Sequence, residues 1–317
     1  MKIAICGLWH VHAEQYYKAA AENAEVVGVY EPNETWRKNF CEKYNLHGFE
    51  SFGELLASDA DSVIVCTPTD AHAEVIVKLA EAGKNIFTEK VLAFTSADCE
   101  KIADAVNKNE VEFVISLPHK YGAAQRTAKA IADSGELGKI NYFRYRNVHS
   151  GSSRDWLPAH FYNAKECGGG AMIDLGAHGM YLSEWFCGMP VSASSTFTLA
   201  AENSGAAEKN TDRVEDNAVT VMKYENGCIG VNETGFVSVG CPIILEVGGE
   251  KGYVRCSPGK LVKNTESTGS KEEETELLAA LPTPIEQFCT GKILPGCGIE
   301  EAKKLTALME LAYGNVQ

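Results

Sequence analysis

Two residues that can exchange a proton stand four positions apart in the segment IDLGAHGMYLSEW, namely Asp174 and His178. The glycines before the segment cannot form a helix interior, so we expect a helix that begins near Ala171. Residues at this spacing lie on one helix face, one turn apart. A histidine titrates near neutrality and suits general acid–base work. Two structural roles compete with this chemistry: a carboxylate that stabilises the helix start, and a hydrogen-bonded core histidine.

A second segment with possible chemistry is AICGLWHVHAEQ, residues 4–15. A strand-like run ends at Gly7, and a helix-like run follows it. Of the dinucleotide-binding pattern G-x-G-x-x-G only the first glycine is present, because Trp9 and His12 occupy the other two positions. The helix start would still offer free N–H groups to a phosphate. The segment is therefore either a cofactor loop or a plain strand–turn–helix.

The elements that would position these residues alternate between strand and helix over the first third of the chain. Ser96 is expected to cap the N-terminus of the last of these helices, and Gly83 to follow the end of the one before it. Strands alternating with helices predict parallel βαβ units and a doubly wound α/β sheet. The expected strands are 2–6, 25–30, 61–66, 85–90 and 111–117, and the main helices 13–23, 34–45, 70–83 and 96–109.

Ligands of such a sheet bind at the carboxyl ends of its strands. Glu31 follows the second strand, 24 positions after Gly7. A carboxylate near this spacing can hold the ribose hydroxyls of NAD and would repel the 2′-phosphate of NADP, so we expect NAD. Structural roles remain open for His10, and for His72 as a brace of the loop. The remaining candidates for cofactor binding are Gly7, Leu8, Trp9, His10, Val11, Thr67, Pro68, His72 and Glu89.

Motifs along nearly the whole chain resemble those of one family. The segment SVIVCTPTDAHAEVIVKLAEAGKNIFTEK (62–90) contains a strand, T-P-x-x-x-H, a helix that ends in Ala-x-x-Gly-Lys, and Glu-Lys. Further segments are SGELGKI (134–140), GGGAMIDLGAHGMYLSEWFCG (168–188), EDNAVTVMKYENGCIG (215–230) and TGKILPGCGIEEAKKLTALMELAY (290–313). Together they are similar to the Gfo/Idh/MocA family, named for glucose-fructose oxidoreductase, inositol dehydrogenase and a rhizopine-catabolism protein.

The resemblance implies a Rossmann domain followed by an α/β domain with a large open, mostly antiparallel sheet. We place the boundary at Pro118, with an NAD-binding domain at 1–118 and a substrate-binding and oligomerisation domain at 119–317. The residues of the second half support this organisation. Asn-Gly in YENGCI predicts a hairpin, and EEAKKLTALMELAYGN predicts a final amphipathic helix. Strand-like segments are NYFRYRNVHS, AVTVMKYE, CIGVNETGFVS and IILEVGG.

The resemblance also implies that Lys90, Asp174 and His178 are catalytic. Removal of a hydride from an alcohol carbon requires removal of the hydroxyl proton as well. Either His178 or Lys90 would accept this proton, and Lys90 would otherwise polarise the substrate oxygen. Asp174 would orient a partner or bind a neighbouring hydroxyl. The structural alternative for Lys90 is a solvated surface lysine.

Two departures from the family pattern concern these residues. Val91 stands where the family has the proline of Glu-Lys-Pro, and we expect a trans Lys90–Val91 bond, because a cis bond before a non-proline residue costs ~3 kcal/mol. The usual His-x-x-Asp is His178-x-x-Tyr181 here. The acidic partner of His178 is therefore missing from its family position.

Candidate substrate-binding residues come from two further segments. LPHKYG (117–122) falls where the family has a segment that enters the active site, which makes His119 and Lys120 candidates. The segment SSRDWLPAHFYN (152–163) combines an aromatic face with polar groups, which suits a sugar. It contributes Arg154, Trp156, His160 and Tyr162. The alternative is an ordinary loop in which Trp156 anchors the core.

Composition narrows the class of protein. The net charge of −14 argues against nucleic-acid partners, which need Lys and Arg for the phosphates. The 11 cysteines contain no C-x-x-C pair, so we expect no metal site. We see no signal peptide and no apolar run of the ~20 residues needed to span a membrane, and expect a cytoplasmic protein. The resemblance implies a homodimer or homotetramer.

These inferences favour an NAD-dependent oxidoreductase that acts on a secondary alcohol of a sugar, cyclitol or related polyol. Two other functions remain open. One is a glycoside hydrolase or lyase that oxidises its substrate transiently and then returns the hydride. The other is a non-catalytic sensor of a dinucleotide or sugar.

Overall fold

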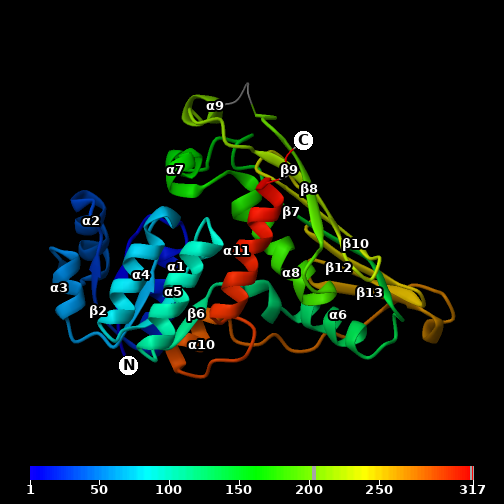
Figure 1. Ribbon diagram of the computed structural model, residues 1–317, viewed down its shortest axis with the longest axis horizontal. Helices are drawn as coiled ribbons and strands as arrows, with labels where there is room; N and C mark the ends of the chain where they lie inside the picture. Colours follow the sequence, from blue (N-terminus) through cyan, green and yellow to red (C-terminus); the bar gives the residue numbers. More distant parts are fainter. Residues whose placement is uncertain (202–204, 315, 317) are drawn as a thin grey trace. The chain divides into compact units, whose positions relative to one another are not determined.

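The computed structural model describes residues 1–201, 205–314 and 316, and these divide into two compact units (Figure 1). The first unit comprises Met1–Leu117 and Pro282–Thr306, and the second comprises Pro118–Leu281 and Ala307–Gln317. The sequence-based boundary at Pro118 placed residues 282–306 in the second domain. In the structure these residues pack with the first unit.

The first unit is built on a parallel sheet of six strands within the described residues, in the order β3-β2-β1-β4-β5-β6. This order confirms the predicted doubly wound α/β fold. Strands β1, β4, β5 and β6 are almost entirely buried, because helices cover both faces. The strands are β1 (Lys2–Cys6), β2 (Glu25–Tyr30), β3 (Gly48–Phe49), β4 (Ser62–Val65), β5 (Asn85–Thr88) and β6 (Phe113–Ile115).

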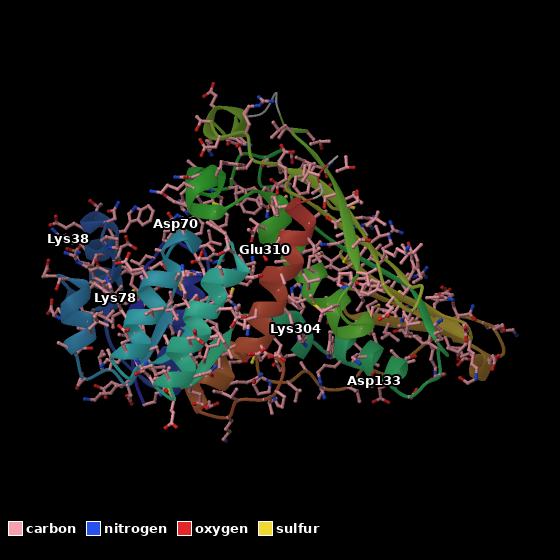
Figure 2. The ribbon with its side chains drawn as sticks, in the orientation of Figure 1. Lys38, Asp70, Lys78, Asp133, Lys304 and Glu310 are labelled. Carbon is pink, nitrogen blue, oxygen red and sulfur yellow. The ribbon has the colours of Figure 1, made fainter. Side chains whose placement is uncertain are left out.

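The helices of this unit pack in pairs, α4 against α5 and α1 against α10. Their outer faces carry charged side chains such as Lys38 and Lys78, which project away from the ribbon (Figure 2). The elements are α1 (Ala13–Asn23), α2 (Glu34–Tyr44), α3 (Phe52–Ala57), η1 (Thr69–Ala71), α4 (His72–Glu81), α5 (Ser96–Lys108) and α10 (Pro284–Thr290). No helix of the described residues combines the length and the hydrophobicity needed to cross a membrane.

One predicted cap is displaced by a residue. The N-cap of α5 is Thr95, whose hydroxyl oxygen accepts the Asp98 N–H at 3.1 Å, so the prediction of Ser96 is wrong. Threonine and serine both suit an N-cap. Thr95 takes the position because its backbone is extended and the helix begins at the next residue. Gly83 does follow the end of α4, with a φ of +71° that favours glycine.

The second unit contains a sheet of eight strands within the described residues, in the order β14-β13-β12-β11-β7-β10-β9-β8. Only the β7–β10 pair is parallel, which confirms the predicted mostly antiparallel sheet. The strands β9 and β10 form the hairpin predicted from Asn-Gly. The strands are β7 (Ile140–Val148), β8 (Ser192–Thr198), β9 (Asn217–Lys223), β10 (Ile229–Gly235), β11 (Ile244–Gly249), β12 (Gly252–Ser257), β13 (Lys260–Thr265) and β14 (Glu273–Glu274).

Helices pack on one face of this sheet, with α8 on β7 and β10 and α6 on β12 (Figure 1). On the opposite face, alternate residues such as Val219, Val221 and Ile229 are exposed. The elements are η2 (Pro118–Tyr121), α6 (Ala123–Asp133), η3 (Ala159–Tyr162), α7 (Ala164–Cys167), η4 (Met172–Gly176), α8 (Ala177–Cys187), α9 (Ala206–Lys209) and η5 (Glu266–Thr268). The last helix, α11 (Ile299–Gly314), has residues in both units.

The helical segment that carries Asp174 and His178 differs from the expected one. It opens with the π-helical turn η4 and becomes α-helical only at Ala177. The predicted helix start near Ala171 is confirmed, but its first turn is a π-helix, which the sequence analysis did not predict. A π-turn has i→i+5 hydrogen bonds and therefore contains more residues per turn than an α-helix. The helix propensities of the residues do not reveal this feature.

Glu215 holds the beginning of this segment. Its Oε1 accepts the N–H groups of Gly170 and Met172 at 3.0 and 2.9 Å and the hydroxyl of Tyr313 at 2.7 Å. Its backbone carbonyl accepts the Ala171 N–H at 2.8 Å. Burial raises the pKa of Glu215, and these donors oppose the shift. The carboxylate thus satisfies N–H groups that a helix start leaves unpaired.

The close approach of the two backbones at this point generates a stability prediction. A Cβ at Gly170 would lie 1.9 Å from the Glu215 carbonyl oxygen, so Gly170→Ala must displace backbone. We expect a loss of about 1–3 kcal/mol in unfolding free energy, measured by urea titration.

The matched control is Gly53→Ala in α3, where the nearest atom is 3.8 Å from the new Cβ. Alanine is the better helix former, so this variant should be as stable as the parent or slightly more stable. Equal stability of the two variants would contradict the packing described for Gly170.

Candidate active site

In the first unit, the loop after β1 approaches the end of β4 at Gly7. The φ of Gly7 is +90°, and a Cβ there would lie 2.6 Å from the Thr67 nitrogen. The His10 N–H donates to the Cys66 carbonyl at 3.1 Å. Only glycine fits at residue 7, which explains why the first glycine of the motif is present.

Glu31 is buried at the end of β2 and joins two loops. Its Oε2 accepts the Leu8 N–H at 2.7 Å, and its Oε1 accepts the Asn33 N–H at 2.9 Å. The carboxylate therefore lies beside the loop after β1, at the strand end where a ribose is bound in this fold. Arg37 donates to the backbone carbonyl of Glu31 and so fixes the position further.

The loop after β4 carries a buried polar group that lacks a partner. The Thr67 hydroxyl has no hydrogen-bond partner among the described residues. His72 lies behind this loop, fully buried, with Nε2 3.2 Å from the Thr67 carbonyl oxygen. Its Nδ1 lies 3.1 Å from the carbonyl oxygens of Val91 and Leu92. Burial lowers the pKa of His72. This geometry matches the bracing role considered for it.

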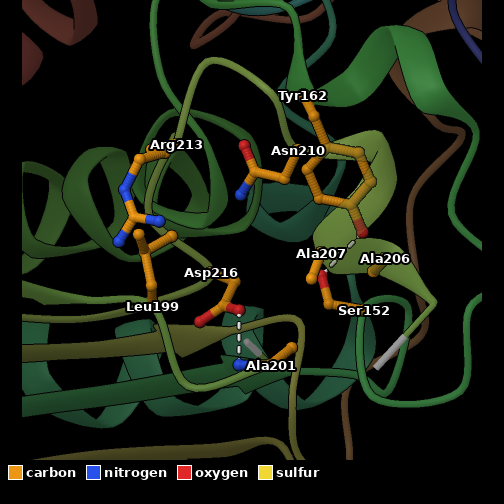
Figure 3. A pocket seen from close by; sticks show the side chains of 9 residues that line it. All are labelled: Ser152, Tyr162, Leu199, Ala201, Ala206, Ala207, Asn210, Arg213 and Asp216. Atoms are coloured by element: carbon orange, nitrogen blue, oxygen red, sulfur yellow. Dashed lines mark hydrogen bonds between the residues drawn. The ribbon is translucent and has the colours of Figure 1, made fainter. Parts of the chain in front are cut away.

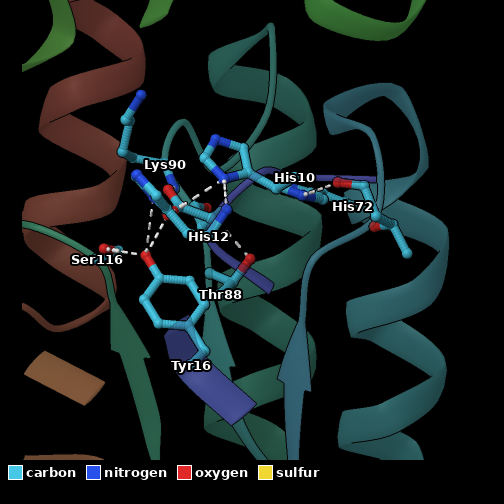
Figure 4. A network of polar contacts seen from close by, with 9 residues as sticks. His10, His12, Tyr16, His72, Thr88, Lys90 and Ser116 are labelled. Atoms are coloured by element: carbon cyan, nitrogen blue, oxygen red, sulfur yellow. Dashed lines mark hydrogen bonds and ion pairs between the residues drawn. The ribbon is translucent and has the colours of Figure 1, made fainter. Parts of the chain in front are cut away.

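Glu89, which follows β5, is the centre of a buried polar network. Its partners His12 and Tyr16 are labelled in Figure 4. Its Oε1 accepts hydrogen bonds from the Tyr16 hydroxyl and, at 2.7 Å, from His12 Nδ1. His10 Nδ1 lies 3.6 Å from the same oxygen. The Tyr16 hydroxyl is also 2.8 Å from Ser116 Oγ, which follows β6. The network joins α1 to the ends of β5 and β6.

The charge of Glu89 is compensated in place. Burial alone would raise the pKa of Glu89, but the positive charge of His10, the hydrogen bond from His12 and the charge of Lys90 together hold it well below its usual range. His10, His12 and Glu89 also lie close enough to hold a metal ion. The carboxylate oxygen that would bind it already accepts a hydrogen bond from the Tyr16 hydroxyl, which favours a hydrogen-bonded network.

Lys90 itself is buried, and its backbone N–H donates to Glu89 Oε2 at 2.8 Å. Its side chain extends away from the network in Figure 4. The surface-lysine alternative is therefore wrong. The Lys90–Val91 peptide bond is cis, so the expectation of a trans bond is also wrong. Its neighbours Val91, Leu92 and Ala93 are all buried, and this packed environment overrides the local preference.

Sequence reasoning missed His12, Tyr16 and Ser116 as members of the network. His12 and Tyr16 are four residues apart at the beginning of α1, a spacing that places them on one face, and this signal could have found them. Of the two other loop residues proposed for the cofactor, Trp9 is buried and Val11 is exposed.

These features fit a dinucleotide. The backbone of Thr67 leaves no space for a side chain at Gly7, Thr67 offers an unpaired buried hydroxyl, and Glu31 offers a carboxylate at the ribose position. The residues that would hold the cofactor are those at the ends of β1, β2 and β4.

In the second unit, His178 is buried and bonded to a tyrosine. Its Nδ1 lies 2.9 Å from the Tyr181 hydroxyl oxygen. The same oxygen accepts a hydrogen bond from the backbone N–H of His119 at 3.1 Å. The rings of His119 and His178 stack with centroids 4.1 Å apart and an interplanar angle of 19°. His119 Nδ1 is in turn 2.7 Å from the Tyr145 hydroxyl.

Asp174 is half-buried on η4, and its charge acts on His149 at the end of β7. Burial lowers the pKa of His149, and the negative charge of Asp174 opposes this shift. The His149 ring stacks on Phe236 and lies 4.7 Å from the ring of Trp156. Trp156 is 53% exposed, so the alternative of a core anchor is wrong. His149 was missed, since nothing in its local sequence marks it.

The other residues proposed for substrate do not gather at one place. Tyr162 is buried and its hydroxyl lies 2.7 Å from Ser152 Oγ, at a cavity of about 290 Å³ (Figure 3). Asp216 and Arg213 line the same cavity. His119 and Tyr145 line a different cavity of about 320 Å³. Arg154 is exposed, and His160 is half-buried on η3.

Fold and site together define a Rossmann-type protein with a second α/β unit built on an open sheet. Residues 1–116 match the oxidoreductase family with an NAD-binding Rossmann fold, and residues 125–255 match the GFO/IDH/MocA C-terminal domain. The chain belongs to the Gfo/Idh/MocA family, as its motifs predicted.

Individual relatives are distant. The chain is 27% identical over 188 residues to a levoglucosan dehydrogenase of Pseudarthrobacter phenanthrenivorans. The aligned region covers 54% of this chain and 48% of that protein. It is 29% identical over 195 residues to a scyllo-inositol 2-dehydrogenase (NAD(+)) of Bacillus subtilis, with coverages of 61% and 54%. These matches span about half the length of the relatives.

Among solved structures, the fold is similar to an aldose-aldose oxidoreductase from Caulobacter crescentus. The TM-score is 0.82 at 20% identity, and the alignment covers 99% of this chain and 97% of that chain. At this identity the likeness concerns the fold.

The buried network generates a prediction for Glu89→Gln. Because its pKa is depressed, Glu89 contributes stability above the unfolded-state value of about 4.5, and this contribution is lost as the pH falls through the folded-state value. At pH 7 the variant should lose about 1.5–3 kcal/mol of unfolding free energy, measured by denaturant titration.

The difference between parent and variant should shrink as the pH is lowered below about 4.5. The control Glu81→Gln, at the exposed end of α4, should change little at either pH. A difference between parent and Glu89→Gln that stays constant with pH would contradict an ionised Glu89.

Proposed function

We propose that the protein is an NAD-dependent oxidoreductase that transfers a hydride between nicotinamide and a secondary alcohol of a sugar, cyclitol or related polyol. The observation that carries the proposal is the buried, fixed placement of Lys90 and His178 in a chain whose two units match both domains of the family. The names of the relatives, a levoglucosan dehydrogenase and an inositol dehydrogenase, support the substrate class.

The first unit would hold the cofactor through the loop after β1, Glu31 and Thr67. Bound NAD supplies the hydride acceptor or donor. The Glu31 carboxylate would accept hydrogen bonds from the hydroxyls of a ribose and would repel a 2′-phosphate. The beginning of α1 would offer its dipole and N–H groups to the phosphates. Glu89 accepts a hydrogen bond from the backbone N–H of Lys90 and so fixes the backbone at that residue.

The second unit would bind the substrate and manage its proton. His178 and Lys90 are the two groups suited to exchange the hydroxyl proton. Asp174 binds a neighbouring hydroxyl or orients a partner. The exposed ring of Trp156 offers an apolar face for sugar C–H groups, and His119, Arg154, His160 and Tyr162 are the remaining substrate candidates.

The protein acts in the cytoplasm as a homodimer or homotetramer in this account. Its eleven cysteines are all free, which suits a reducing compartment. The exposed apolar residues of β9 and β10, Val219, Val221 and Ile229, suit burial against a second copy. Light scattering that gives the mass of a monomer at micromolar concentration would contradict the assembly.

The activity is tested by incubating the protein with NAD⁺ and a panel of polyols, sugars and glycosides while nicotinamide absorbance and product masses are followed. NADH formed together with a ketone is the expected result. Cleavage of a glycoside without accumulation of NADH would establish the transient-oxidation alternative instead. Bound NAD⁺ with no reaction on the panel would favour a sensor.

With a substrate in hand, Lys90→Ala should lower kcat by roughly 100- to 10,000-fold, because a positioned proton-transfer or polarising group is lost. Steady-state kinetics measure the change. The control Lys78→Ala removes an exposed lysine of α4 and should leave kcat within about twofold. Unchanged turnover in Lys90→Ala would show that the assigned chemistry is wrong.

The cofactor preference is tested at Glu31. Glu31→Gln removes the charge while retaining an acceptor for one of the two N–H groups, so NAD⁺ should bind roughly tenfold more weakly and discrimination against NADP⁺ should relax. Titration calorimetry with both cofactors measures this. Comparable affinity of the parent protein for NAD⁺ and NADP⁺ would refute the role of Glu31.

A further inference from the structure

Two cysteines of the second unit lie with their sulfurs in contact. The Sγ atoms of Cys187 and Cys228 are 3.8 Å apart, although the residues are separated by 41 positions in the sequence. Both thiols are free. Cys187 is the last residue of α8, and Cys228 directly precedes β10. The fold therefore brings together two thiols that no motif of the sequence pairs.

The backbone is held in position on both sides of this contact. In the hairpin of β9 and β10, the Cys228 N–H donates to Asn226 Oδ1 at 2.9 Å, and the Cys228 carbonyl accepts the Tyr224 N–H at 3.1 Å. At the end of α8, the Gly188 N–H donates to the Glu184 carbonyl at 2.8 Å. The helix itself packs on β10. The proximity of the two sulfurs thus follows from elements that are hydrogen-bonded and packed together.

A small movement would suffice to form a disulfide from this arrangement. An S–S bond is about 2.05 Å long, so the two sulfurs need to approach each other by about 1.8 Å. Rotation about the χ1 bond of a cysteine moves its sulfur by distances of this order. The pair therefore meets the first requirement for a cross-link, which is proximity.

The two thiols differ in accessibility and in acidity. Cys228 has no exposed surface, whereas Cys187 is half-buried. The hydrogen bond between the two sulfurs lowers the pKa of the Cys228 thiol, and burial opposes this shift. The same hydrogen bond, burial and the charge of Cys228 raise the pKa of Cys187, and the positive charge of Lys129 opposes that shift. Cys187 is thus the residue that an oxidant reaches first, and Cys228 is the one that more readily forms a thiolate beside it.

We propose that Cys187 and Cys228 are an oxidation-sensitive pair that hydrogen peroxide converts into a disulfide. Peroxide transfers one oxygen to the Cys187 sulfur, which gives a sulfenic acid and one water. The Cys228 sulfur then attacks the Cys187 sulfur, the S–S bond forms, and the sulfenic oxygen leaves as a second water. The two sulfurs lose two electrons, which reduce the O–O bond, and the two thiol protons end in the waters. A thiol reductant reverses the bond.

The disulfide clamps the helix that carries His178. At the beginning of α8, Asn232 of β10 already donates to the Gly176 carbonyl at 2.8 Å. The new bond ties the opposite end of the helix, at Cys187, to the residue before the same strand. Both ends of α8 are then held on β10, which suppresses local opening of the helix. This inference goes beyond the proposed function and does not depend on it.

Mass spectrometry of the peroxide-treated protein tests the cross-link. The reduced protein is exposed to hydrogen peroxide, its remaining thiols are alkylated, and the digest is analysed. The expected product joins the peptides of Cys187 and Cys228 with the loss of two hydrogens, and two of the eleven free thiols disappear. Alkylation of both residues after the treatment, or a sulfinic acid at Cys187 beside an alkylated Cys228, would overturn the proposal.

Two variants test the separate roles of the two sulfurs. Cys228→Ser removes the attacking sulfur, so the sulfenic acid at Cys187 should persist and react with dimedone roughly tenfold more than in the parent. Cys241→Ser removes another half-buried cysteine of the same unit and should form the cross-link as the parent does. Equal labelling of Cys187 by dimedone in the two variants would contradict the role of Cys228.

Hydrogen exchange tests the clamp and needs no substrate. The amides of α8 should exchange roughly tenfold more slowly in the cross-linked protein than in the reduced protein, and dithiothreitol should restore the original rate. Cys187→Ser treated with the same peroxide controls for oxidation of methionines and should show no slowing. Equal exchange of α8 in the cross-linked and the reduced protein would show that the bond does not clamp the helix.

Discussion

The carboxylate of Glu215 is the contact on which the placement of the second unit's chemistry depends. Three glycines precede the segment that carries Asp174 and His178, and glycines do not hold a helix start in one position. One buried oxygen accepts two N–H groups and a tyrosine hydroxyl at this point, and the backbone of Glu215 approaches so closely that no side chain fits at Gly170. A π-turn follows directly, and Asn232 of β10 binds the carbonyl of Gly176 at 2.8 Å. The backbone of the segment that carries Asp174 and His178 is therefore held by Glu215 and Asn232.

A comparable carboxylate organises the first unit. Glu89 binds His12 and Tyr16 of α1 and the backbone of Lys90, and the ends of neighbouring strands meet around it. In both units a buried acid is held by backbone N–H groups together with donor side chains from other segments. A buried carboxylate without such donors would be strongly destabilising, so each one fixes its donors in position. This is how a chain without the usual glycines still keeps a defined loop after β1.

The sequence predicted the fold well because its signals are local and repeated. Apolar strands alternating with helices specify the six-stranded parallel sheet, and Asn226-Gly227 specifies the hairpin of β9 and β10. Lys90, Asp174 and His178 were proposed as catalytic from the family resemblance. What local sequence could not supply are contacts across distant segments: the stacking of His119 on His178 and the network at Glu89. The π-turn and the cis bond at Lys90 escaped for the same reason, because tertiary packing selects conformations that local preferences disfavour.

The central claim is that the chain moves a hydride between a carbinol carbon and a nicotinamide. The most direct measurement follows a substrate deuterated at that carbon, incubated with the protein and NAD⁺, with the cofactor then examined by mass spectrometry. The account predicts deuterium in the nicotinamide ring. In net oxidation the label accumulates in NADH, and in transient oxidation it appears in the bound cofactor and returns to the product. Conversion of the substrate with NAD⁺ bound and no deuterium in the cofactor at any time would contradict the account.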